Sequence, residues 1–243
     1  MSEATGEENP AGFFPTLAGI YVAPRRTLAA IARRPAVWAP LFPFVGAQAL
    51  FNAVWLLQLD PREFARAEVE DSPFAEQMSP EQRAAGIESQ AGIFPFVAWL
   101  DPLVLRPLSL LLVALVALFV FRFFYAAEMT FKQSLAVVGW TFLAMILVTL
   151  PLALLVLYLN DDWNVDPRTA LQANLTLLFD KGSVPRAVYS IAESLDLFSA
   201  WILALLSIGY GAASGRRAGQ AAKGVVAMWA IYVVGKAALA AVF

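Results

Sequence analysis

The chain alternates between long apolar runs and shorter segments that hold nearly all of its charged residues. A helix needs about 20 mostly apolar residues to cross a hydrocarbon core roughly 30 Å thick. Five runs meet this requirement, at about residues 37–59, 103–124, 135–159, 195–213 and 225–243, and the fourth is the shortest. The pattern therefore predicts an all-α integral membrane protein with five transmembrane helices.

Lysine and arginine near the ends of these runs predict the orientation, because short cytoplasmic loops are enriched in both residues. With the N-terminus inside, nine lie on the inner side, and seven lie in the much longer outer loops, about residues 60–102 and 160–194. Fifteen of the nineteen acidic residues fall on the outer side. We therefore predict that the N-terminus lies inside and the C-terminus outside.

The N-terminal region divides into an acidic tail and a basic segment. Residues 1–15 contain three glutamates and no basic residue, which predicts a disordered tail and argues against a cleaved signal peptide. Residues 16–243 are predicted to form a single membrane domain. The outer stretches "DPREF" and "SPEQ", which start at Asp60 and Ser79, each combine a capping residue with a following proline and predict short helices.

The stretch "PRRTLAAIARRP", Pro24 to Pro35, predicts a short basic helix just before the first span. Leu28 and Ile31 would form its apolar side, and such a helix would lie in the inner membrane interface. Its four arginines either serve only as a topological anchor or recognise anionic lipid headgroups or a protein partner; these residues are Arg25, Arg26, Arg33 and Arg34. A nucleic-acid clamp is not expected, because the segment joins directly to a span.

Composition removes several classes of chemistry. The sequence is 60% hydrophobic, with a mean hydropathy of +0.65, and it contains no cysteine and no histidine. Thiol nucleophiles, thiolate metal sites and histidine-based hydrolysis are therefore excluded. We predict no catalytic residue, no metal site and no cofactor.

Three polar residues lie within the predicted spans. Gln48 and Asn52 are four residues apart, so they share one helix face and are predicted to hydrogen-bond between helices, or else to line a path for substrate or water. Lys236 lies seven residues from the end of the chain. Its ammonium is predicted to snorkel or to pair with an outer carboxylate, and ion or proton coupling is the functional alternative.

Two stretches resemble a known family. "YVAPRRTLAAIARRPAVWAPLFPFVG" and "EMTFKQSLAVVGWTFLAMIL", Tyr21 to Gly46 and Glu128 to Leu147, are similar to segments of the bacterial branch of the YIP family, the Ypt/Rab-interacting membrane proteins. The resemblance covers the chain from about residue 15 to its end. It implies a polytopic scaffold in the prokaryotic plasma (inner) membrane. Eukaryotic relatives are associated with prenylated GTPases, vesicle trafficking and membrane shaping, but their longer N-terminal region and its aspartate-leucine-tyrosine-glycine type motif are not found here.

The resulting functional hypothesis is a non-enzymatic scaffold or membrane-organising, trafficking-like protein. Its expected partners are a bilayer with anionic headgroups and either another protein or a second copy of the chain, but not nucleic acid. The alternative is a small-solute transporter or channel subunit, since Pro40, Pro43 and Pro151 could break helices in the spans. The scarcity of charge at membrane depth argues against that alternative.

Overall fold

A computed structural model describes residues 12–72, 74–171, 173–179 and 183–242, and these residues form an all-α structure. The only β feature in this part of the chain is one isolated bridge between Asn174 and Asp196. The helices are α1 (Phe13–Val22), α2 (Pro24–Arg33), α3 (Trp38–Gln58), α4 (Pro61–Glu70), η1 (Ala75–Gln77), α5 (Pro80–Val97), η2 (Asp101–Leu105), α6 (Arg106–Tyr125), α7 (Phe131–Asn160), α8 (Pro167–Ala170), η3 (Leu175–Leu178), α9 (Arg186–Ser194), α10 (Leu197–Ala213) and α11 (Ala218–Val242).

Helix starts follow the capping residues of the sequence. The carboxylate of Asp60 accepts hydrogen bonds from the backbone of the first turn of α4, as the "DPREF" stretch predicts. Ser79 and Gln82 form the full reciprocal capping box at the start of α5. Thr130 and Gln133 form a second one at α7. Each box satisfies backbone N–H groups that a helix leaves without an internal partner.

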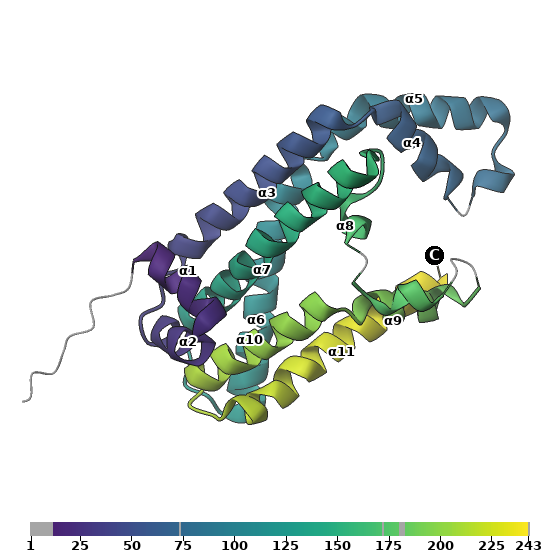
Figure 1. Cartoon of the computed structure of the whole chain (residues 1–243). Helices are drawn as coiled ribbons and strands as arrows, with labels where there is room; N and C mark the ends of the chain where they lie inside the picture. Colours follow the sequence, from purple (N-terminus) through teal and green to yellow (C-terminus); the bar gives the residue numbers. More distant parts are fainter. Residues whose placement is uncertain (1–11, 73, 172, 180–182, 243) are drawn as a thin grey trace, which may run out of the picture.

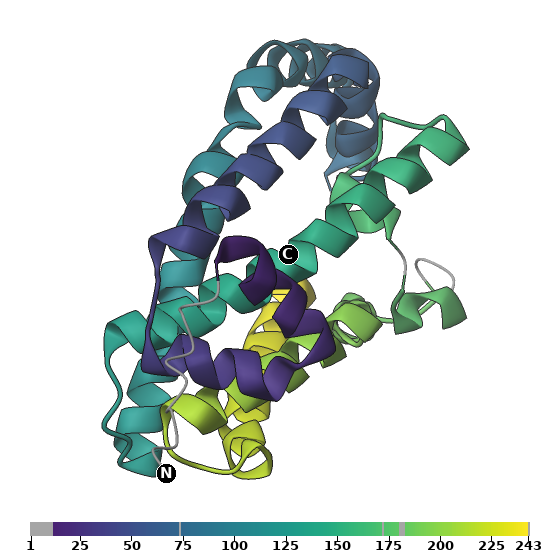
Figure 2. The same cartoon turned by 60° about the vertical axis from the view of Figure 1, so that its left-hand side comes forward.

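The long helices pack into two branches that share one end. Helices α3 and α6 pack on α7, whereas α10 packs on α11. Figures 1 and 2 show the branches close together near α1 and α2 and farther apart toward α5 and α9. Helix α2 contacts both α7 and α10, so it joins the two branches where they meet.

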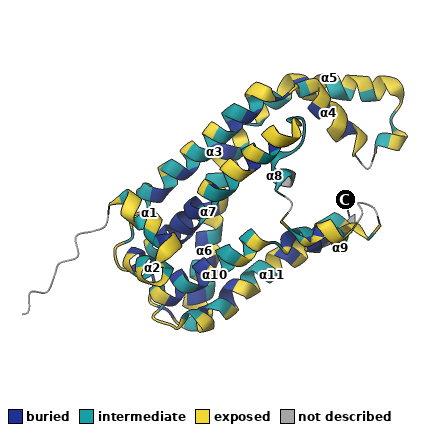
Figure 3. Ribbon diagram, viewed as in Figure 1, coloured by how far each residue is buried: buried dark blue, intermediate teal, exposed yellow. Residues whose placement is uncertain are grey.

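The main core lies where α6, α7 and α10 meet, and Figure 3 shows buried residues concentrated there. Tyr210 and Phe121 are fully buried, and their rings stack with centroids 4.8 Å apart. The Ser134 hydroxyl lies 2.7 Å from the Tyr210 hydroxyl and donates to the carbonyl of Ala114 at 2.6 Å. This network connects one residue from each of the three helices.

A smaller core fixes the far end of the first branch. Trp55 packs edge-on against Phe64 and Phe94, which attaches α4 and α5 to the end of α3. The Trp55 indole N–H also donates to the carbonyl of Trp163 at 2.9 Å. The outer loops are therefore folded onto the ends of the long helices.

Four helical segments in the described part of the chain are long and apolar enough to cross a membrane: Trp38–Gln58, Asp101–Tyr125, Phe131–Asn160 and Ala218–Ala241. The predicted span at 195–213 corresponds to α10, which has 17 residues and falls short of that length. The last span starts at Ala218 rather than near residue 225. The apolar run in the sequence begins after Lys223, but the helix includes this charged residue and the five residues before it. Four of the five predicted spans therefore meet the requirements of length and composition.

The lipid-compatible surface is most evident on α6. Leu108, Leu112, Leu115, Phe119 and Phe123 are all more than half exposed. Exposed apolar surface of this extent is unfavourable in water and ordinary against hydrocarbon. Together with the long apolar helices, it identifies an integral multi-pass membrane protein.

Helices α1 and α9 were not anticipated from the sequence. The predicted disordered tail covers residues 1–15, and residues 1–11 lie outside the described residues. Helix α1 begins at Phe13, so residues 13–15 are helical. Phe13 packs on Trp140 of α7, with ring centroids 5.4 Å apart. Helix α9 lies in the predicted outer loop at 160–194 and packs along α11.

Candidate functional site

The four arginines of the basic segment all lie exposed on or next to α2. Pro24 occupies the first position of the helix, where its missing N–H has no cost, and the helix ends at Arg33. Arg25, Arg26, Arg33 and Arg34 are exposed. Helix α2 and the residue that follows it therefore carry four exposed arginines, and α2 lies at the end of the molecule where the two branches meet (Figure 1).

A helix lying in the membrane interface would turn its apolar side to lipid, but the apolar side of α2 packs on protein. The interfacial position of the helix itself stays a prediction. Leu28 is fully buried and Ile31 is 5% exposed, and both belong to the main core. The apolar stripe was identified correctly from the sequence. The reason for the difference is that α7 and α10 lie beside α2 and cover the stripe before lipid can.

Two contacts fix the orientation of α2, and a third fixes α1 beside it. The Gln133 side-chain amide donates to the carbonyl of Ala32 at 2.9 Å, which connects the end of α2 to the start of α7. Gly19 of α1 lies so close to Thr27 that a Cβ at Gly19 would fall 2.5 Å from the Thr27 hydroxyl oxygen. Helices α1 and α2 can therefore cross at close range only because residue 19 has no side chain.

Tyr21, at the end of α1, makes the third contact. Its hydroxyl donates to the carbonyl of Ala144 in α7 at 2.5 Å, and its ring packs on Trp201 of α10 with centroids 5.9 Å apart. Partial burial raises the pKa of Tyr21 above its usual range, so the hydroxyl stays protonated and can donate. The sequence offers no signal for this role, because its partner Ala144 lies 123 residues away along the chain.

Other cations gather at the same end of the long helices. They come from the end of α6, the start of α7 and the turn between α10 and α11, and all are exposed: Arg122, Lys132, Arg216, Arg217 and Lys223. We call these five residues and the four arginines of the basic segment the basic face. The Arg216 guanidinium donates to the carbonyl of Tyr125 at 2.9 Å, which attaches the α10–α11 turn to α6. Among the described residues at this end, Glu128 is the one acid.

Gln48 and Asn52 are both buried in α3, which packs on α7 within the first branch. The Asn52 side-chain nitrogen is buried and has no hydrogen-bond partner among the described residues. A buried donor of this kind costs about 1–3 kcal/mol. The interhelical hydrogen bond that was expected of Asn52 therefore stays a prediction.

Lys236 lies on α11, in the other branch, and does not meet the α3 pair. Its ammonium forms an ion pair with Glu193 of α9, with nitrogen and oxygen 2.5 Å apart. The Lys236 side chain is 35% exposed and the Glu193 side chain 40%. The sequence indicated an outer carboxylate as the partner but could not identify which one, because α9 was read as loop.

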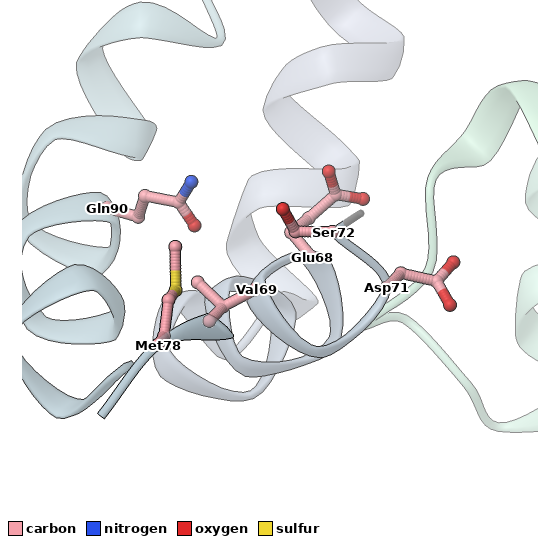
Figure 4. Close-up of a pocket in the computed structure, with 6 residues that line it drawn as sticks. All are labelled: Glu68, Val69, Asp71, Ser72, Met78 and Gln90. Atoms are coloured by element: carbon pink, nitrogen blue, oxygen red, sulfur yellow. The ribbon is translucent and has the colours of Figure 1, made fainter. Parts of the chain in front are cut away.

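A hollow lies on the outer loops, between α4 and α5. It encloses about 460 Å³ and is lined by Glu68, Val69, Asp71, Ser72, Met78 and Gln90. Figure 4 shows that the carboxylate of Asp71 points away from Met78 and Gln90, which lie on the other side of the hollow. Nowhere in the described ranges do three acidic side chains gather as they would around a metal ion.

Comparison with known proteins gives one match. A family model described as the Yip1 domain matches residues 18–239. No curated protein and no solved structure matches the chain. The matched range includes the basic face, all the long helices and the outer loops.

Proposed function

We propose that this chain, which belongs to the Yip1 domain family, is a non-enzymatic scaffold that organises a membrane through its basic face. Its partners in this proposal are anionic lipid headgroups and, on the same face, a protein or a second copy of the chain. The proposed location is a prokaryotic inner membrane, with the basic face toward the cytoplasm. The excess of lysine and arginine at this end supports that orientation.

One observation carries the proposal: α2 directs its arginines outward while its apolar side is fixed in the core. The four guanidinium groups therefore have a defined position relative to the ends of α6, α7, α10 and α11. Each cation near an anionic membrane surface contributes about 1 kcal/mol of attraction. A helix that only anchored the chain would not need its apolar side buried in protein.

The test is the amount of anionic lipid that remains bound to the purified protein, measured by mass spectrometry. Arg25→Gln with Arg26→Gln is expected to lower bound anionic lipid and to weaken its dependence on salt. The matched control is Arg62→Gln with Arg66→Gln, which removes the same charge from exposed ion pairs at the opposite end. Equal retention in the two variants would contradict the proposal.

The orientation has its own test. A fluorescent protein that folds only in the cytoplasm is expected to stay dark when it is fused to the C-terminus and bright when it is fused to the N-terminus. Bright cells with the C-terminal fusion would reverse the proposed orientation. This result would leave the lipid experiment interpretable, because purified protein exposes both ends.

Solute transport is the second candidate, and the unpartnered amide of Asn52 favours it. A polar group at membrane depth without a protein partner can instead bind water or solute. Flux through reconstituted vesicles that disappears with Asn52→Leu would support transport. No flux above that of empty vesicles would leave the scaffold as the better proposal.

A further inference from the structure

Helix α10 is too short to cross a bilayer alone. Its 17 residues span about 25 Å at 1.5 Å per residue, against a hydrocarbon core roughly 30 Å thick. Only Leu195 and Asp196 separate it from α9. Both α9 and α10 pack along α11, and Figure 1 shows them following one another beside it.

The ion pair with Lys236 places α9 at membrane depth. Lys236 lies 13 residues after Lys223, the last charge at the basic end of α11. That separation corresponds to about 20 Å along the helix, which is less than the roughly 30 Å of the core. Because Glu193 contacts Lys236 directly, the end of α9 lies at the same level.

The polarity of α9 is the reverse of that of a helix in water. Along its second half, Ser190 and Ser194 are buried, and Glu193, though 40% exposed, pairs with Lys236 of α11; Arg186, at the start of the helix, is exposed. Val188 and Ile191 are about two-fifths exposed on the outside. An amphipathic helix on a water-facing surface would bury the aliphatic residues and expose the serines.

The neighbouring segment η3 continues this apolar surface. It packs against α9 and exposes Leu175, Leu177 and Leu178, the last two by 66% and 74%. At the start of α10, Leu197 is 70% exposed and extends the surface toward the middle of the membrane. Exposed apolar residues are thus found on η3, on α9 and at the start of α10.

We propose that α9 and η3 are embedded in the leaflet distal to the basic face, where acyl chains cover Val188, Ile191 and Leu177. The fourth crossing along the chain, for which α10 alone is too short, is then a discontinuous helix made of α9 and α10, interrupted at Leu195 and Asp196. Lys236 neutralises Glu193 and so permits a carboxylate at this depth, since an unpaired charge there is costly. This inference goes beyond the scaffold proposal and does not depend on which side of the membrane is cytoplasmic.

The absence of cysteine makes a spin-label test direct, because each introduced cysteine is the only one. We would label Ile191→Cys in the full-length protein in lipid bilayers and compare its collisions with apolar oxygen and with a water-soluble nickel complex. Leu112→Cys on the exposed face of α6 is the lipid reference, and Ala84→Cys, exposed on charged α5, is the water reference. Ala192→Cys, its buried neighbour on α9, is the matched control.

The expected result is a several-fold higher ratio of oxygen to nickel collisions at residue 191 than at residue 84, close to the ratio at residue 112. Residue 192 should collide little with either reagent. Nickel access at residue 191 equal to that at residue 84 would place α9 in water and overturn the inference. Low access to both reagents at residue 191 would mean that protein, such as a second copy, covers α9, and this would also overturn it.

Discussion

The hydrogen-bond chain from Tyr210 through Ser134 to Ala114 provides a quantitative test of the core. A hydroxyl has one hydrogen and a carbonyl only accepts, so Ser134 donates to Ala114 and Tyr210 must donate to Ser134. Replacing Tyr210 with Phe leaves Ser134 bonded to its carbonyl. Replacing Ser134 with Ala instead leaves a fully buried tyrosine hydroxyl without a partner.

The two substitutions should therefore differ in cost. A side-chain hydrogen bond between membrane helices contributes on average about 0.6 kcal/mol and at most about 1.7, so Tyr210→Phe should lower the free energy of unfolding by about 1 kcal/mol. Ser134→Ala adds the desolvation of an orphaned hydroxyl, about 1–3 kcal/mol, and should cost more. The double variant removes the orphan, so its cost should fall below the sum of the two.

The assay is equilibrium unfolding in mixed micelles with increasing sodium dodecyl sulfate, followed by circular dichroism. Ser109→Ala is the control, because that exposed hydroxyl bonds only to Arg106 within its own helix. Two results would refute the reasoning. One is a larger cost for Tyr210→Phe than for Ser134→Ala; the other is additivity of the two within about 0.3 kcal/mol.

Three further outcomes are expected. Gly209→Ala should destabilise the bundle by about 1–3 kcal/mol, since its Cβ would fall 2.5 Å from Val137 Cγ1, and adding Val137→Ala should restore most of the loss in the same unfolding assay. Lys236→Met should lower the melting temperature by leaving Glu193 unpaired, and adding Glu193→Gln should recover it; no recovery would show that packing alone holds α9. Ser79→Ala should cost about 1 kcal/mol locally, seen as faster hydrogen exchange at the start of α5 with unchanged exchange in α7.

The local features of the chain could be predicted from the sequence. Hydropathy located the long helices, because each needs its own run of about 20 apolar residues whatever its neighbours are. Caps at Asp60 and Ser79 are equally local, since the bonding groups lie within four residues of one another. The basic segment was likewise recognised as a helix with one apolar side.

Only the tertiary structure decided what covers each apolar side. Leu28 and Ile31 looked like lipid-facing residues but are buried by α7 and α10, whereas Ile191 lay in a predicted water-exposed loop and is presented on the outside of α9. Periodicity identifies an apolar stripe but cannot tell whether protein or hydrocarbon removes it from water, because both do so with similar free energy. The pairing of Lys236 with Glu193 could not be predicted from the sequence either. The two residues are 43 positions apart in the chain, and only the packing of α9 on α11 brings them together.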